Sequence, residues 1–503
     1  MSANEIEAQT FPAGTEARIS ASIQVAVIIL IALLAFAQTF SSGPYEGIAD
    51  GMRYLASGHS LITEGHGYSN PIRYDQLATS FFPPKPYPYP SQLVQLLLGG
   101  LIALGASPNI STLALANLIA FAGSLFAIFG ILRVAIDAGW ALAGTAFIGL
   151  TVPQFRYISL NFATEAWMML FGLIALWAIL KGRYVLAGVC LGFGFFFRAQ
   201  ISAWLPASIG NPFPSRRRIM GLLLGISASA ILTWLALKLM FPKAGESTTG
   251  FYGRVFTQKY TLSPSQAIQV VSDNLYDFKW LWFSFAASFA LLIAARILKA
   301  GAAAREVTAF YVTSTVTMAL FAFYMAGTVG DGVSDRYFVH LICLFWLALF
   351  LLIGDVLTRR TASFRHSRYI AATTSGVLVL ISAFQVDWAN AKQNFMAEDF
   401  PPAIFESVGA GSIIMVSYGT PVISLQIDKA RKVTFPPYET FIAGDNQKVD
   451  FLFLDARNDG IPEDWQASWD VEEIRDGSGV TFKREASFES PARSSRLFRR
   501  VSP

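Results

Sequence analysis

Two carboxylates, Glu46 and Asp50, lie just after the first apolar run, in a polar stretch over residues 41–109. A carboxylate at a membrane boundary is surrounded by a lower dielectric than one in water, which favours its use as a general base. An aromatic side chain, Tyr54, follows Asp50 one helical turn later. On residue type alone, Asp50 could equally be a helix N-cap or a solvated loop acid. Residue type alone leaves the role of Asp50 open, and Glu46 is the only nearby alternative base.

Cations within two residues of an aromatic residue form a second set of candidates. A guanidinium or ammonium group at the depth of lipid headgroups can stabilise a phosphate group by charge-assisted hydrogen bonds. The ordinary alternatives are snorkelling of long side chains and an interfacial aromatic belt. The set consists of Lys85, Arg198, Arg254, Lys259, Arg336 and the adjacent Tyr337.

The composition limits the class of protein in which these residues act. Hydrophobic residues make up 53% of the 503 residues, and charged residues only 14%. Soluble domains carry about 25% charged residues, so a soluble enzyme, a disordered chain and a nucleic-acid-binding protein are excluded. With a mean hydropathy of +0.46, the chain is predicted to be a polytopic α-helical membrane protein.

The apolar runs predict the topology, because about 20 apolar residues cross a bilayer. The short run 91–105 is expected to lie along the interface, since only this choice places every basic cluster on the cytoplasmic side. The N-terminus is then cytoplasmic, and about eleven transmembrane helices remain. The predicted crossings are 23–40, 110–135, 138–153, 163–180, 184–197, 199–210, 219–241, 278–296, 306–328, 337–357 and 369–386.

The end of the chain differs from the membrane body in charge. Half of the 34 acidic residues follow residue 388. We therefore predict a transmembrane body over residues 1–388, with 41–109 as its first periplasmic loop, and a soluble periplasmic domain over 389–503. Buried strands expected near 413–416 and 449–454 indicate a small α/β or α+β unit.

The first polar loop resembles that of the GT-C superfamily of polyprenyl-phosphate-sugar-dependent glycosyltransferases, which includes protein O-mannosyltransferases and lipid A aminoarabinose transferases. The resemblance rests on Asp50 and Tyr54, on the Gly-rich turn over residues 64–68, and on the proline segment over 83–87. One departure is that Asp50 is followed by Gly51, where many members have an Asp-Glu pair. Two interface helices, near 50–62 and 91–105, are implied.

Further motifs of this resemblance continue to about residue 386. They are Thr164-Glu165 at the start of an apolar run, the Gly-rich run that ends at Arg198, and Asp335-Arg336-Tyr337 before a late apolar run. An acid at a helix N-terminus is also favourable to the helix dipole by itself. The C-terminal domain carries no motif of this group.

The resemblance implies an inverting glycosyltransferase that moves a hexose or pentose from a polyprenyl-phosphate donor to a glycan, lipid or protein acceptor at the periplasmic face of the inner membrane. Asp50, Glu46 and Glu165 would be catalytic carboxylates. Tyr54, His66 and Tyr87 would contact substrate. The cations above and Tyr337 would bind the donor phosphate and lipid.

Two alternatives stay open: an O-antigen ligase or polymerase, and a transporter or flippase of lipid-linked sugars. A transporter predicts ionisable residues at mid-membrane and internal repeats, of which the sequence contains little. No cofactor is expected apart from the donor substrate, although a divalent metal remains open, and no set of metal ligands is predicted. Membrane lipids are expected partners and nucleic acid is not.

Overall fold

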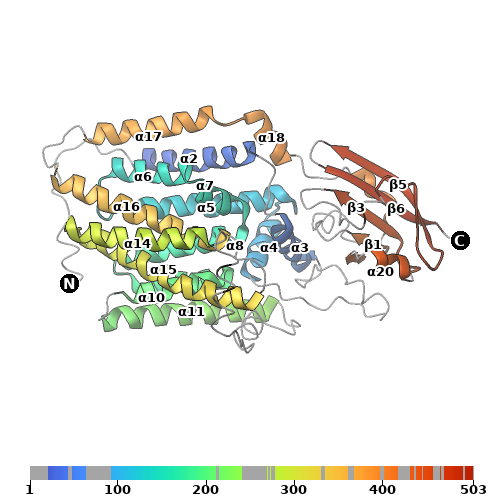
Figure 1. Cartoon of the computed structure of the whole chain (residues 1–503), viewed down its shortest axis with the longest axis horizontal. Helices are drawn as coiled ribbons and strands as arrows, with labels where there is room; N and C mark the ends of the chain where they lie inside the picture. Colours follow the sequence, from blue (N-terminus) through green and yellow to red (C-terminus); the bar gives the residue numbers. More distant parts are fainter. Residues whose placement is uncertain are drawn as a thin grey trace. The chain divides into compact units, whose positions relative to one another are not determined.

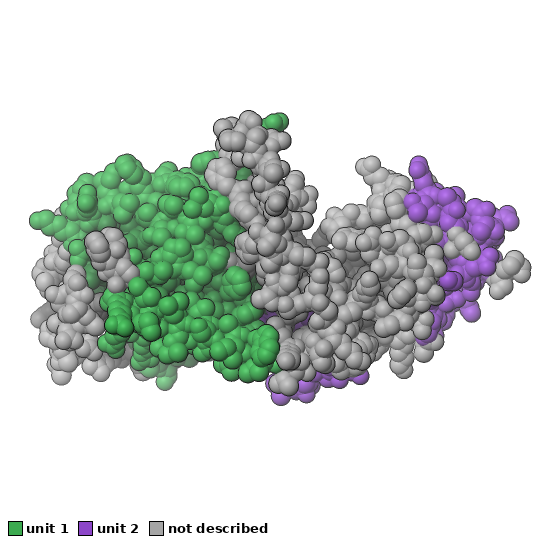
Figure 2. All heavy atoms as spheres, turned by 90° about the horizontal axis from the view of Figure 1, so that it is seen from below, with its two compact units in different colours: residues 1–42, 116–237, 248–391 green, residues 43–115, 238–247, 392–503 purple. Residues whose placement is uncertain are grey.

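The computed structural model describes residues 21–42, 48–63, 92–210, 215–240, 269, 272, 278–329, 335–360, 367–396, 402–409, 411–416, 431–434, 438–444, 446–456, 465, 469–490 and 493–501. The chain divides into two compact units, coloured in Figure 2, which we describe separately. Unit 1 comprises residues 1–42, 116–237 and 248–391, and unit 2 comprises residues 43–115, 238–247 and 392–503.

Unit 1 is helical throughout its described part (Figure 1). Its apolar runs form helices because a backbone surrounded by lipid must satisfy its hydrogen bonds internally. Helices α5, α11 and α18 extend across the boundary between the units. The elements are α2 (Ala21–Ser41), α5 (Ile110–Leu132), α6 (Ala138–Thr151), α7 (Pro153–Asn161), α8 (Ala163–Leu180), α9 (Tyr184–Phe197), η2 (Ala199–Ala203), α10 (Trp204–Ile209), α11 (Arg216–Met240), α14 (Lys279–Ile297), α15 (Ala302–Val329), η3 (Asp335–Phe338), α16 (Val339–Arg360), α17 (Ser367–Phe384) and α18 (Trp388–Met396).

Six described helices are long and apolar enough to cross a membrane, namely α2, α5, α8, α11, α14 and α16. Shorter apolar helices include α6, α9 and the later part of α17. The chain is a multi-pass membrane protein, as the composition indicates, and the number of about eleven crossings stays a prediction. The run 199–210 differs from an expected crossing. It forms η2 and the six-residue α10, and neither is long enough to span a bilayer.

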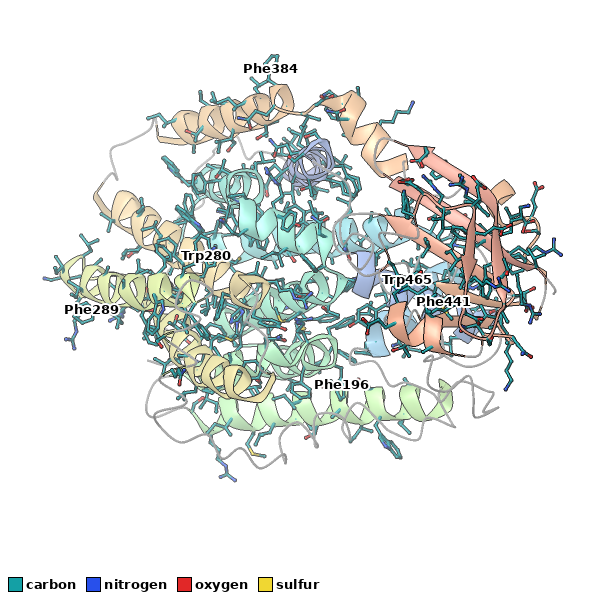
Figure 3. All side chains as sticks on the ribbon, turned by 45° about the vertical axis from the view of Figure 1, so that its right-hand side comes forward. Phe196, Trp280, Phe289, Phe384, Phe441 and Trp465 are labelled. Atoms are coloured by element: carbon teal, nitrogen blue, oxygen red, sulfur yellow. The ribbon has the colours of Figure 1, made fainter. Side chains whose placement is uncertain are left out.

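The helices of unit 1 pack in two neighbouring groups. Helices α2, α6 and α17 lie side by side, and α14, α15 and α16 contact one another (Figure 1). Large side chains such as Phe121, Phe155 and Phe338 are completely buried between helices. Phe289 and Phe384 instead lie on the outside (Figure 3), with 69% and 88% of their surface exposed. Such exposure is expected for side chains that face lipid.

Helices α9 and α11 approach each other closely through glycines. A Cβ on Gly188 would lie 2.2 Å from the carbonyl oxygen of Leu222, and one on Gly225 would lie 2.2 Å from that of Val185. Small residues allow helix backbones to pack closely in membranes, where van der Waals contact replaces the hydrophobic effect as the driving force.

Unit 2 contains two helices from the first polar loop, α3 (Ile48–Thr63) and α4 (Gln92–Ala103). They pack against each other through Gly58 and Gly99, where a Cβ on Gly58 would lie 2.7 Å from the Gly99 nitrogen. The two helices coincide with the predicted interface helices, and their position at a membrane surface stays a prediction.

The C-terminal part of unit 2 is a mixed six-stranded sheet of order β2-β1-β3-β6-β5-β4. Strand β1 pairs in parallel with β2 and β3, and the remaining pairs are antiparallel. The two strands expected from the sequence correspond to β1 and β3, while the proposed domain limits 1–388 and 389–503 stay a prediction. The elements are η4 (Pro402–Phe405), β1 (Ile413–Val416), β2 (Arg431–Thr434), α20 (Tyr438–Ala443), β3 (Phe451–Ala456), β4 (Glu473–Arg475), β5 (Thr481–Ser490) and β6 (Arg493–Val501).

One core covers a face of this sheet. Phe441 of α20 packs against Trp465, with ring centroids 5.0 Å apart (Figure 3), and both side chains are completely buried. Phe482 of β5 joins the same cluster. The burial of these aromatic groups stabilises the sheet in its present register.

Candidate functional site

Breaks between helices position the charged side chains of unit 1. Phe162 is extended and separates α7 from α8, so Glu165 lies in the first turn of α8. Arg198 follows the last residue of α9 in an extended conformation. Arg336 lies in the short helix η3, immediately before α16. Each of these side chains therefore stands at the end of an apolar helix.

Three charged groups converge at these helix ends. Nη2 of Arg198 lies 3.1 Å from Oε1 of Glu165, and Nε of Arg336 lies 3.6 Å from the same oxygen. Nη1 of Arg198 donates to the Thr164 hydroxyl at 3.0 Å, and that hydroxyl donates to Oε2 of Glu165. Residues from three separate segments of the sequence thus share one carboxylate.

Aromatic rings complete the cluster. The guanidinium of Arg198 lies 5.1 Å from the centroid of Tyr337, and that of Arg336 lies 5.6 Å from the same ring. Arg336 also lies 5.3 Å from the centroid of Phe162. Cation–π contacts at such distances hold a guanidinium in place without neutralising its charge.

The burial of the cluster decides which charge a ligand would meet. The side chain of Glu165 is 2% exposed, whereas those of Arg198 and Arg336 are 14% and 25% exposed. The carboxylate is enclosed and both guanidiniums reach the surface. Among the described side chains of the cluster, two cations accompany one anion, and two planar donor groups there suit an anion such as phosphate.

The structure brings together four of the predicted site residues: Glu165, Arg198, Arg336 and Tyr337. Asp50 lies in α3 of unit 2, and its side chain is outside the described part. Tyr54 is buried in the same helix. Six further candidates lie outside the described residues: Glu46, His66, Lys85, Tyr87, Arg254 and Lys259.

Two residues near this end of unit 1 were not expected from the sequence. The Phe162 ring lies against the Arg336 guanidinium, and its place two residues before the Thr164-Glu165 motif was the available signal. Arg156 lies on α7, in a connection predicted to be outside. Translocated loops are poor in Lys and Arg, so an arginine there was itself a signal. Among the described residues, no group of three His, Cys, Asp or Glu side chains could hold a metal ion.

Comparison with solved structures identifies the fold. The chain is similar to ArnT from Cupriavidus metallidurans bound to undecaprenyl phosphate, with 11% identity and a TM-score of 0.53 over 95% of this chain and 98% of that one. It also matches the oligosaccharyltransferase AglB from Archaeoglobus fulgidus in complex with an inhibitory peptide and a dolichol-phosphate, with 12% identity and a TM-score of 0.44 over 86% and 69% of the two chains. No family model matches the sequence, and no curated protein matches it.

The match to ArnT extends over nearly the whole chain, so the GT-C-like fold predicted from the motifs is confirmed. At 11% identity this likeness establishes the fold and leaves the activity to be argued from the site.

Proposed function

We propose that this protein is an inverting glycosyltransferase that uses a polyprenyl-phosphate-linked sugar as donor. The observation that carries the proposal is the convergence of Arg198 and Arg336 on the buried Glu165, which leaves two guanidiniums accessible at one end of the helical body. The fold supports it, because the similar ArnT was solved with undecaprenyl phosphate bound.

In the proposed reaction, the oxygen of an acceptor hydroxyl attacks the anomeric carbon of the donor sugar. The bond between that carbon and the phosphate oxygen breaks, and its electron pair leaves with the polyprenyl phosphate. The hydroxyl proton passes to a carboxylate, for which Asp50 is the first candidate and Glu46 the second. Attack from the face opposite the phosphate inverts the anomeric centre.

The arginines would act on the leaving group. The phosphate gains negative charge as the glycosidic bond breaks, and preorganised cations lower the free energy of that transition state. We assign this role to Arg198 and Arg336, with Tyr337 as their common support. Glu165 would be a positioning residue, because both guanidiniums and the Thr164 hydroxyl already engage its oxygens.

The remaining candidates complete the proposal. Lys85, Arg254 and Lys259 would contact the lipid phosphate, and Tyr54, His66 and Tyr87 the sugar or acceptor. We place the reaction at the periplasmic face of the inner membrane, with a glycan, lipid or protein as acceptor. A carboxylate held by two arginines at a helix end favours chemistry near the headgroups over passage through the bilayer.

A donor-binding experiment tests the role of the arginines. Arg336→Gln and Arg198→Gln should each weaken binding of a polyprenyl-phosphate sugar by about 10–100-fold, because a hydrogen bond to a charged group contributes about 1.5–3 kcal/mol. Arg183→Gln is the matched control. Arg183 caps the other end of α9 and also lies over an aromatic ring, 5.6 Å from Trp177. Unchanged donor binding and turnover in Arg336→Gln would refute the assignment.

The base is tested separately, by turnover at saturating donor. Asp50→Asn keeps the shape of the side chain and removes its basicity, so turnover should fall by about 10²–10⁴-fold while donor binding stays normal. Glu46→Gln should have a milder effect, and the reverse order would identify Glu46 as the base. If neither variant is impaired, and the wild type moves lipid-linked sugar across vesicles without transfer, the protein is a transporter.

A further inference from the structure

A second polar network in unit 1 contains one arginine, Arg156, and does not include Glu165. Nη1 of Arg156, on α7, donates to the carbonyl oxygen of Leu150 at 2.7 Å and to the side-chain oxygen of Gln38. The Gln38 amide in turn donates to the carbonyl of Ser382 at 3.2 Å and to the Gln385 side chain at 3.4 Å. One guanidinium therefore joins the ends of α2, α6 and α17.

The charge of Arg156 has only neutral partners. Both acceptors of Nη1 are amide oxygens, Nε is buried without an acceptor, and Arg156 takes part in none of the ion pairs of the described residues. A half-buried cation without a counter-charge is costly, because desolvation is not offset by Coulomb attraction. The charge therefore indicates an anion that the described residues do not supply.

The surroundings place this cation at the depth of lipid headgroups. Gln385 is exposed and lies in the sequence between Phe384, which is 88% exposed (Figure 3), and Trp388, which is 60% exposed. Aromatic residues at helix ends collect at the boundary between hydrocarbon and headgroups. The phosphate groups of membrane lipids lie at this level. Further exposed apolar side chains, including Val377 and Leu380, lie on α17, the helix that ends beside Gln385.

We infer that Arg156 binds the phosphate of a lipid headgroup, at a site separate from the cluster around Glu165. Gln38 orients the guanidinium, and its contact with Gln385 extends the polar network to the lipid-exposed end of α17. The site is a binding site and carries out no chemistry. It does not depend on the proposed glycosyltransferase activity, because a membrane protein with any function could retain a lipid there.

The test uses the full chain in phosphate-free maltoside micelles, in an Arg336→Gln background that removes the proposed donor site. The probes are farnesyl phosphate, phosphatidylglycerol and inorganic phosphate, and the readouts are bound lipid by native mass spectrometry and the rise in Tm. A ligand that binds only the native state raises Tm in proportion to its affinity. We expect lipid binding to weaken at least about tenfold in Arg156→Gln and to persist in Arg156→Lys.

Arg133→Gln is the control, because Arg133 lies at the turn between α5 and α6, at the opposite end of α6 from α7, and also donates to a main-chain carbonyl. The more effective lipid identifies whether an isoprenoid phosphate or a bulk phospholipid is bound. If inorganic phosphate stabilises the protein as well as either lipid, the lipid assignment is wrong. If Arg156→Gln lowers Tm without lipid and leaves the lipid-dependent rise unchanged, Arg156 is a structural clamp and the inference fails.

Discussion

Glu165 is more buried than either guanidinium that it holds, and this difference explains what each group can do. The Glu165 carboxylate lies among Arg198, Arg336 and the Thr164 hydroxyl and is only 2% exposed, so a substrate has little access to it. The two guanidiniums keep accessible edges. The carboxylate lies within ion-pair distance of both and reduces their mutual repulsion. Glu165 therefore stabilises the arrangement of the two cations.

We predict that Glu165→Gln destabilises the helical body by about 3–5 kcal/mol, because it removes the buried carboxylate that Arg198 and Arg336 share. The double variant Glu165→Gln/Arg198→Gln should recover part of this loss, since it removes one of the repelling charges. The measurement is the Tm of each variant in the same detergent. Strict additivity of the two single losses would show that Glu165 and Arg198 do not interact.

The charges of this cluster were predictable from the sequence, and its geometry was not. Glu165, Arg198 and Arg336 each stand at the end of an apolar run, which marks them as candidates at the interface. Their shared carboxylate depends on how α8, α9 and η3 pack, and no local pattern records that packing. Arg156 was missed for the same reason, because its partners come from α2 and α6.

At the scale of elements, the packing of α9 against α11 depends on glycines, because the close approach of the two backbones leaves no room for a side chain at these positions. We predict that Gly188→Val and Gly225→Val each lower thermal stability strongly, because the added carbons would overlap carbonyl oxygens and force the helices apart. Gly376→Ala in α17 is the control, since a Cβ there meets nothing within 4 Å. That change should be neutral or stabilising by up to about 1 kcal/mol. Wild-type Tm values in both valine variants would contradict the close approach.

The hairpin of β4 and β5 depends on one carboxylate, Asp476. Its Oδ1 accepts from the main-chain nitrogen of Val480 and the hydroxyl of Ser478, both at 2.8 Å, and its Oδ2 accepts from the Asn446 amide at 3.0 Å. Burial raises the pKa of Asp476, but these hydrogen bonds outweigh burial and hold the pKa below its usual value. The charged form is therefore the one that stabilises the hairpin.

The sign of this shift gives a pH dependence. The stabilisation from Asp476 is complete above the pKa of an unfolded aspartate, about 3.9, and is lost as pH falls through the lower pKa of the folded state. Asp476→Ala should cost about 1–3 kcal/mol at neutral pH, because it leaves buried donors without an acceptor. Amide exchange of residues 473–490 in the full chain, corrected for intrinsic rates, measures both effects. Equal protection in wild type and variant at pH 7 would contradict the prediction.

Hydrophobic patterning predicted the types of element better than it predicted their lengths. The long apolar runs form helices close to their predicted bounds. A helix that is apolar on all sides is stable when lipid or other helices surround it. The run 199–210 became η2 and α10, with Gly210 at a φ of +84° ending the second. Strands β5 and β6 were not expected, since their many charged residues mask the alternation that marks a strand.

At the scale of the whole chain, the helix ends of unit 1 sort into two chemical classes. One set carries Glu165, Arg198 and Arg336. The other set carries contacts among basic turns, such as the ion pair of Arg218 with Glu306 at 2.7 Å and the hydrogen bond from the Gly301 nitrogen to Asp355 at 2.6 Å. The orientation proposed from the sequence would place the second set in the cytoplasm and the first set outside.

We therefore predict that the basic turns face the cytoplasm and that residues 389–503 face the periplasm. Ser487→Cys, at an exposed position of β5, should react with a membrane-impermeant maleimide in intact spheroplasts. Ala302→Cys, at the start of α15 beside the basic turn, should react only after lysis. The native Cys190 and Cys343 are buried and should give little background. The opposite labelling pattern would invert the topology, and it would place the Arg198 and Arg336 cluster on the cytoplasmic side, away from any periplasmic acceptor.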